Sequence, residues 1–303
     1  MRLVLFAHPS LGAKLLTAFL YSGEEVAAVF ILGSDPEKAS PLKMTAIEHH
    51  IPFHEPGHMK DAEVHETLRR YQANLGVLAF VQDIVPTAIL DCPQQGTIMF
   101  HPSLLPRHRG GSAINWAIIM GDKKTGLSII WPDDGIDTGP ILLQKEVPIL
   151  PDDTVGTLFF DKLYPMGIET LVEAVGLVKS GQAPHIPQDE RQATYEPLCR
   201  ERHVVIDWKL PATTVYDLIR GSNPRPGATT TYRDRKIKLL DSSLVPEVNA
   251  APGEVTAVGD DGFVIACRDG GILVRVVRPA GGDKTGAADF VKAAGIAPGE
   301  RLG

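Results

Sequence analysis

The chain has 303 residues, 44% of them hydrophobic, and a formal net charge of −7. This length predicts about two domains, and the acidic balance argues against a nucleic-acid partner held by a broad basic face. Three widely spaced cysteines exclude a disulfide framework and provide no zinc-ligand pattern. No run approaches the ~20 apolar residues of a membrane helix. We therefore expect a cytoplasmic protein with no membrane partner.

Strand-like and helical patterns alternate through the first hundred residues. Predicted strands cover Arg2–Ala7, 25–32, 52–55, 75–80 and 96–100, and predicted helices cover 11–21, 40–49 and 62–72. This alternation predicts a Rossmann-like α/β domain, a mostly parallel sheet with helices on both faces. The first turn, His8-Pro9-Ser10-Leu11-Gly12, is not G-x-G-x-x-G. A nicotinamide or flavin cofactor is therefore not expected.

The composition and the predicted secondary structure of the chain change near residue 200. We predict a helix over 112–121 with Ser112 as its N-cap, a strand over 127–131, and a long helix over 153–179 broken at Tyr164-Pro165. A proline-rich linker over 182–202 places the domain boundary at about 203, between domains 1–202 and 203–303. After a short helix at 211–220 come strands at 228–232, 236–241, 253–258, 263–267 and 272–279. Their hairpin-type turns predict a small OB-like antiparallel β-barrel.

The most chemically loaded stretch runs from residue 100 to 140. His101 follows one predicted strand, and Asp137 lies in the loop after another. Because ligands bind outside the carboxyl ends of strands in open α/β sheets, these two side chains are candidates for one site. A histidine acts there as general acid or oxyanion donor, and an aspartate as base, in acyl transfer without a covalent enzyme intermediate. The alternative is that His101 packs at a strand end and the acidic run is a solvated loop.

Several neighbouring features qualify this hypothesis. Gly135 and Gly139 bracket Asp137 and allow a sharp turn or a close approach to a ligand, whereas Asp133 and Asp134 are interpreted as loop-capping carboxylates. The basic loop 104–111 is either a turn that caps a helix or a clamp for an anionic substrate. The histidine-rich stretch 49–58 is interpreted as surface, so no metal is expected. No G-x-S-x-G elbow occurs, which argues against a hydrolase triad.

Three motifs connect the chain to a known family: H-P-S-L-L-P-R-H-R-G from residue 101, S-A-I-N-W from 112, and D-D-G-I-D-T-G-P-I-L-L-Q from 133. They resemble the 10-formyltetrahydrofolate-dependent formyltransferase family, and most of all the amino-terminal hydrolase domain of 10-formyltetrahydrofolate dehydrogenase. The resemblance implies 10-formyltetrahydrofolate as formyl donor and His101 and Asp137 as the catalytic pair. It also implies that folate lies along the backbone at Asp137 and along Asp83, Ile84, Val85, Ser103, Leu104, Leu105 and Pro106.

Met99 departs from the pattern of the family's transferases, which carry asparagine two residues before the histidine. It agrees instead with the hydrolase domain, which is apolar there. A missing amide removes one donor from a developing oxyanion, and such a loss costs about 100-fold or more in rate. The chain also stops at Gly303, so we do not expect it to oxidise the formyl group by itself. The short loop 33–39 and the acidic charge argue against the longer basic insertion of the initiator-tRNA formyltransferases.

Three functions remain open at this point. The first is an enzyme that transfers a formyl group from 10-formyltetrahydrofolate to water or a small acceptor. The second is a methionyl-tRNA formyltransferase. The third is a catalytically weak folate-binding module of a larger assembly.

Overall fold

The computed structural model describes residues 1–33, 40–81 and 83–303. The loop 33–39, used above as an argument against a tRNA partner, therefore lies outside the described residues except for Gly33. The chain forms two compact units, each assembled from separate stretches. The first comprises Met1–Gly111, Gly126–Val147 and Leu163–Tyr195, and the second comprises Ser112–Thr125, Pro148–Lys162 and Glu196–Gly303. The single boundary at about 203 stays a prediction.

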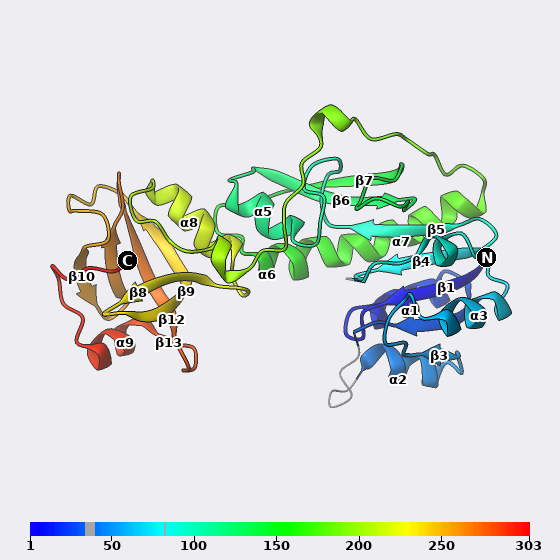
Figure 1. The fold of residues 1–303 in the computed structure, drawn as a ribbon, viewed down its shortest axis with the longest axis horizontal. Coiled ribbons are helices and arrows are strands. Elements are labelled where there is room, and N and C mark those ends of the chain that lie inside the picture. Colours follow the sequence, from blue (N-terminus) through cyan, green and yellow to red (C-terminus); the bar gives the residue numbers. More distant parts are fainter. Residues whose placement is uncertain (34–39, 82) are drawn as a thin grey trace. The chain divides into compact units, whose positions relative to one another are not determined.

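The first unit is built on a seven-stranded sheet in the order β3-β2-β1-β4-β5-β6-β7 (Figure 1). β1 to β5 are mutually parallel where they pair, and β6 runs antiparallel to β5. The strands are β1 (Arg2–Ala7), β2 (Glu25–Ile31), β3 (Phe53–His54), β4 (Leu75–Ala79), β5 (Thr97–His101), β6 (Lys124–Ile130) and β7 (Ile141–Pro148). The Rossmann-like sheet is thus confirmed. β7 was not predicted.

Helices cover both faces of this sheet, as the continuous apolar runs predicted. Leu3 and Leu5 of β1 pack with α1 (Gly12–Tyr21), α2 (Pro41–Glu48) and α7 (Tyr164–Lys179). Val4 and Phe6, which point the other way, pack with α3 (Ala62–Arg70) and α4 (Thr87–Leu90). All four β1 side chains are fully buried. Burial of each side chain contributes about 1.5–3 kcal/mol. Packing on both faces of the sheet therefore holds β1 in place.

The second unit contains an antiparallel sheet in the order β10-β11-β12-β9-β8, with β13 paired to β12. Its strands are β8 (Ala228–Tyr232), β9 (Arg235–Val245), β10 (Val255–Gly259), β11 (Gly262–Ala266), β12 (Gly271–Pro279) and β13 (Thr285–Gly286). The predicted hairpin turns join β10 to β11 and β11 to β12. The helices α5 (Ala113–Ile119), α8 (Ala212–Gly221) and α9 (Ala287–Ala294) belong to this unit, and α9 was not predicted.

The predicted helix over 153–179 is three pieces. α6 (Val155–Thr157) leads into a π-helical stretch, Leu158–Leu163, and α7 begins at Tyr164. Pro165 therefore stands in the first turn of α7, where its missing N–H leaves no intrahelical bond unmade. Among the described residues, no helix combines the length and apolar character needed to cross a membrane.

Candidate active site

His101 is the last residue of β5 and is only 5% exposed. Its Nε2 lies 2.9 Å from the main-chain carbonyl oxygen of His108. A carbonyl only accepts, so Nε2 carries the hydrogen and donates it. The ring is thereby fixed in one orientation, and Nδ1 is the nitrogen that faces the loop after β6.

Asp137 occupies that loop, and its carboxylate meets His101. Asp137 Oδ2 lies 3.4 Å from His101 Nδ1 and accepts a hydrogen bond of 2.7 Å from the main-chain N–H of Gly110. Its side chain is 12% exposed. The backbone of Asp137 has φ +57°, a left-handed conformation that costs a residue with a side chain about 1–3 kcal/mol and persists only where the surroundings hold it. The two residues predicted to share one site therefore lie side by side.

Gln188 holds the Asp137 loop in this conformation. Its Nε2 donates to the carbonyl oxygens of Asp137 and Gly139, both at 2.8 Å. Its Oε1 accepts from Nε and Nη2 of Arg109, at 3.1 and 2.7 Å. The sequence placed Gln188 in the linker and gave it no role. The one nearby signal was the motif A-T-Y-E at 193–196.

Arg109 is a buried structural cation, so this arginine of the basic loop is not available to clamp an anion. It is 1% exposed, and the Glu190 carboxylate accepts from both terminal nitrogens at 2.6 and 3.0 Å. These hydrogen bonds raise the pKa of Arg109 and lower that of Glu190. Tyr195 adds a hydrogen bond and a ring contact at 4.9 Å. The guanidinium is thus engaged by its own chain, and it connects the loop at residue 109 to the segment 188–195.

Asp83, Ile84 and Val85, the residues after β4 that are expected to hold folate, differ from one another in burial and hydrogen bonding. Asp83 accepts from the main-chain N–H groups of Met59 and Ile84 at 3.0 and 2.9 Å. Its carboxylate therefore shapes the turn. Ile84 is 81% exposed, and Ile136, next to Asp137, is 61% exposed. Val85 is half-buried against the α3–α4 side of the sheet. Two large apolar side chains thus stand in solvent on the loops that end β4 and β6.

The loop from Ser103 to Pro106 is held by hydrogen bonds within the protein. Ser103 is fully buried, and its hydroxyl donates to the Arg107 carbonyl at 2.7 Å. Ser128 Oγ accepts from the Leu105 N–H at 3.1 Å, and the Leu105 carbonyl accepts from Gln144 Nε2 at 2.8 Å. Leu105 is 3% exposed, Leu104 and Pro106 are half-buried, and the Leu105–Pro106 peptide bond is cis. The loop is a rigid element that ends next to His108 and its carbonyl.

Met99 lies two residues before His101 on β5, so both side chains project from the same face of the strand. Met99 is half-buried and packs against the cluster of Leu105, Ile130 and Ile141. The surroundings of position 99 are therefore apolar. No side-chain amide stands where the family's transferases would place one.

The loop around Asp137 is shaped by its glycines and by Asp133. A Cβ on Gly139 would lie 1.8 Å from the Trp131 carbonyl oxygen, and one on Gly135 would lie 2.0 Å from Thr138 Oγ1. Asp133 accepts from the Gly135 N–H at 3.1 Å and from the Thr138 hydroxyl, and so caps the loop as expected. Asp134 accepts from the hydroxyl of Thr87. The atoms that approach Gly135 and Gly139 closely therefore belong to the protein itself. In the described part of the chain, no three His, Cys, Asp or Glu side chains are grouped to hold a metal.

Comparison with known proteins places these features in one family. A formyl transferase family model matches residues 1–175, and the model of the formyl transferase C-terminal domain matches residues 200–295. The chain therefore belongs to the formyl transferase family, a family of enzymes.

Two curated relatives cover nearly all of the chain. Human cytosolic 10-formyltetrahydrofolate dehydrogenase is 38% identical over 97% of this chain, which spans 34% of that protein. Methionyl-tRNA formyltransferase of Trichlorobacter lovleyi is 35% identical over 99% of this chain and 96% of that protein. The chain thus spans about a third of the length of the dehydrogenases it matches.

Solved structures share the fold. HypX from Aquifex aeolicus, in complex with tetrahydrofolic acid, superposes with a TM-score of 0.67 at 20% identity over 96% of this chain and 47% of that one. An N-formyltransferase from Helicobacter canadensis gives 0.69 at 18% identity over 90% of this chain and 99% of that one.

Proposed function

We propose that the chain transfers the formyl group of 10-formyltetrahydrofolate to water or a small acceptor and releases tetrahydrofolate. The observation that carries this proposal is the 3.4 Å distance between Asp137 Oδ2 and His101 Nδ1. The two groups lie at the carboxyl end of β5, in a chain of the formyl transferase family. An imidazole and a carboxylate so placed provide both proton positions that acyl transfer to a nucleophile requires.

His101 and Asp137 divide the proton chemistry between them. Nε2–H is committed to the His108 carbonyl, so Nδ1 is the nitrogen that faces the formyl oxygen. In the doubly protonated ring, Nδ1–H donates to that oxygen as it gains negative charge. Asp137 orients the attacking water or amine and accepts its proton. When the bond from the formyl carbon to the folate nitrogen breaks, that nitrogen takes up the proton that Asp137 accepted from the nucleophile. Formate or a formylated acceptor leaves, together with tetrahydrofolate.

The loops around the pair suit a pterin ring system. Ile84 and Ile136 expose apolar side chains on the loops that follow β4 and β6. We assign folate binding to Asp83, Ile84, Val85 and Met99, to the loop from Ser103 to Pro106, and to the Asp137 backbone. Within that set, the apolar side chains provide contact area. Asp83 and Ser103 act through the backbone shapes that they stabilise.

Met99 favours water or slow turnover over efficient transfer. The apolar side chain offers no hydrogen bond to a developing oxyanion, and one such donor is worth about 100-fold or more in rate. Likeness to the dehydrogenases over 97% of the chain points the same way. A second candidate is formylation of methionyl-tRNA, which the end-to-end similarity to a methionyl-tRNA formyltransferase favours and the net charge of −7 disfavours.

Donor turnover tests the proposal. Purified protein is incubated with 10-formyltetrahydrofolate alone, and then with amino acids, amino sugars or methionyl-tRNA, and tetrahydrofolate and formyl products are quantified. His101→Ala and Asp137→Asn should each lower the rate about 100-fold or more, while Asp134→Asn, on the same loop, should not. The proposal is abandoned if no acceptor gives product, or if His101→Ala turns over at the wild-type rate.

A further inference from the structure

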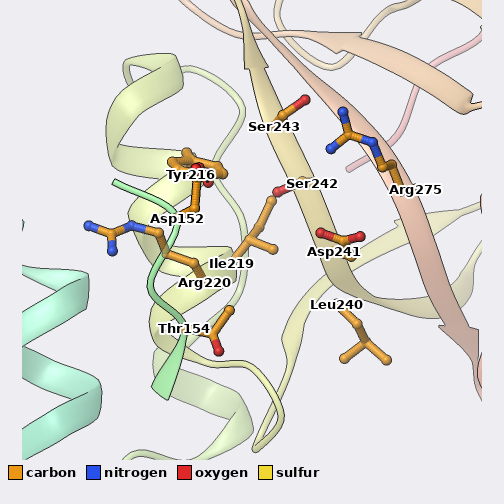
Figure 2. Close-up of a pocket in the computed structure, with 10 residues that line it drawn as sticks. All are labelled: Asp152, Thr154, Tyr216, Ile219, Arg220, Leu240, Asp241, Ser242, Ser243 and Arg275. Atoms are coloured by element: carbon orange, nitrogen blue, oxygen red, sulfur yellow. Dashed lines mark hydrogen bonds between the residues drawn. The ribbon is translucent and has the colours of Figure 1, made fainter. Parts of the chain in front are cut away.

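A cavity of about 320 Å³ lies within the second unit, and neither His101 nor Asp137 is among the residues that line it. Figure 2 shows its walls: α8 on one side, β9 and β12 on the other, and the stretch before α6. Its size is at the lower end of small-molecule sites, which range over about 300–1,000 Å³. It has room for a ligand of roughly amino-acid size.

Two β-bulges form the sheet wall of this cavity. Val274 pairs with Ser242 and Val276 with Asp241, so Arg275 is an extra residue on β12. Val276 pairs with Asp241 and Val277 with Leu239, so Leu240 is an extra residue on β9. Bulges redirect side chains and occur frequently beside functional sites. Both extra residues line the cavity, and in Figure 2 Arg275 reaches from β12 toward β9.

Ser242 places a hydroxyl without a partner in this wall. The residue is 8% exposed, and its Oγ has no hydrogen-bond partner among the described residues. A buried hydroxyl left unpaired costs about 1–3 kcal/mol, and native structures contain few such groups. A ligand in the cavity would supply the missing partner.

Opposite charges line the same space without being neutralised. Asp241 and Arg275 are both exposed, and within the described chain neither side chain forms an ion pair or a hydrogen bond. The other guanidinium, that of Arg220, is engaged: Nε donates to Asp217 at 2.7 Å and Nη1 to the Asp153 carbonyl at 2.9 Å. Arg275 is therefore the cation available to a ligand.

Tyr216 and Asp152 complete the polar wall. Tyr216 donates to Asp152 Oδ1 at 3.0 Å. Burial, together with that hydrogen bond and the charges of Asp152 and Asp241, raises the pKa of Tyr216 to about 12. Tyr216 is thus a neutral donor already used by Asp152, whose second oxygen adds to the negative side of the cavity.

We propose that this cavity binds a small zwitterion of amino-acid size, with its ammonium group at Asp241 and its carboxylate at Arg275. An arginine fork matches a carboxylate with two parallel hydrogen bonds. Ser242 Oγ hydrogen-bonds to the same ligand. A simple anion would meet the carboxylates of Asp152 and Asp241, and a simple cation would meet Arg275. Only a molecule with both charges satisfies both sides of the cavity.

Calorimetric titration of the whole chain with individual L-amino acids tests the site, with L-lysine and L-ornithine among them. Each amino acid is compared with its methyl ester, which lacks the carboxylate, and with its Nα-acetyl derivative, which lacks the α-ammonium. At least one amino acid should bind with a Kd below about 1 mM, and both derivatives should bind at least about tenfold more weakly.

Substitutions then locate the binding. Asp241→Asn and Arg275→Gln should each weaken it about 10- to 100-fold, and Ser242→Ala about 3- to 10-fold. Arg278→Gln, an exposed arginine on the same strand, should leave it unchanged. Because the side chains of Asp241 and Arg275 are exposed and form no hydrogen bond or ion pair within the described residues, thermal melts of these variants should match wild type. The inference is overturned if no amino acid binds at about 10 mM, or if binding survives Asp241→Asn or Arg275→Gln.

Discussion

Replacement of Gln188 by leucine should slow turnover without emptying the substrate site. The wild-type amide donates to the carbonyls of Asp137 and Gly139 and accepts twice from Arg109. Leucine has similar volume but makes none of these four hydrogen bonds. Asp137, held at φ +57°, would then lose the donor that fixes its carbonyl, and its carboxylate would drift from His101.

The size of the fall in kcat follows from the two carbonyls, those of Asp137 and Gly139, that lose their hydrogen-bond donor. Each buried carbonyl that loses its donor costs about 1–3 kcal/mol, and water replaces part of that loss at the half-buried Asp137. A penalty of about 1.4–2.8 kcal/mol on the reactive geometry corresponds to about 10- to 100-fold in kcat. Gln188 also fixes the Asp137 backbone, to which we assign folate binding, so KM for the folate donor should rise as well, but by less than kcat falls.

Steady-state consumption of 10-formyltetrahydrofolate measures both constants. Gln192→Leu is the matched control, because Gln192 lies on the same segment and donates to the Asp189 side chain, away from the pair. Gln188→Glu distinguishes loss of the donor to the Asp137 loop from loss of the acceptor for Arg109. Glutamate keeps the acceptors for Arg109 but turns an oxygen toward the two carbonyls. A folded Gln188→Leu enzyme with kcat within twofold of wild type would refute the reasoning.

Three other changes test separate parts of the structure. Met99→Asn restores an amide beside His101 and should raise transfer to an amine by up to about 100-fold, read as formylated product per unit of formate. Gly139→Ala places a Cβ 1.8 Å from a main-chain oxygen and should lower both Tm and kcat. Glu300→Gln addresses acid stability: the hydrogen bond from Tyr232, followed by that from Arg233, holds the Glu300 pKa at about 2. The wild-type advantage in Tm should be present above about pH 4.5 and vanish as pH falls toward 2.

The sheet and the position of His101 at the end of a strand could be predicted from local patterns. Arg2–Ala7 is apolar on both faces, which only a central parallel strand requires, and His101 directly follows such a run. The sequence missed β7, Ile141–Pro148, since three consecutive polar residues in its middle, Gln144, Lys145 and Glu146, break the apolar pattern and resemble a solvated loop. It missed α9 for a related reason. Ala287–Ala294 buries only Ala287 and Val291 fully, so the helical stripe is narrow.

Arg109 and Gln188 show why the rest of the site could not be predicted. Seventy-nine residues separate them, and each belongs to a segment whose composition indicates a surface loop. An arginine between histidine and glycine is normally a solvated or ligand-binding side chain. Here it is buried because Glu190 and Tyr195 arrive from the stretch taken as a linker. Burial of a charge is stabilising only when such partners are present together, and no window of sequence contains all four residues.

The geometry of the pair depends on this buried network more than on the strands that carry it. β5 fixes the position of His101, but Asp137 stands on a loop in a conformation that its own sequence disfavours. Its carboxylate is placed by the Gly110 N–H and its carbonyl by Gln188, and both of these groups adjoin Arg109. A neutral, smaller residue at 109 should therefore act on the reaction through Asp137. Arg109→Leu should lower kcat at least as much as Gln188→Leu, and combining the two should cost less than the sum, because both remove one connected set of hydrogen bonds.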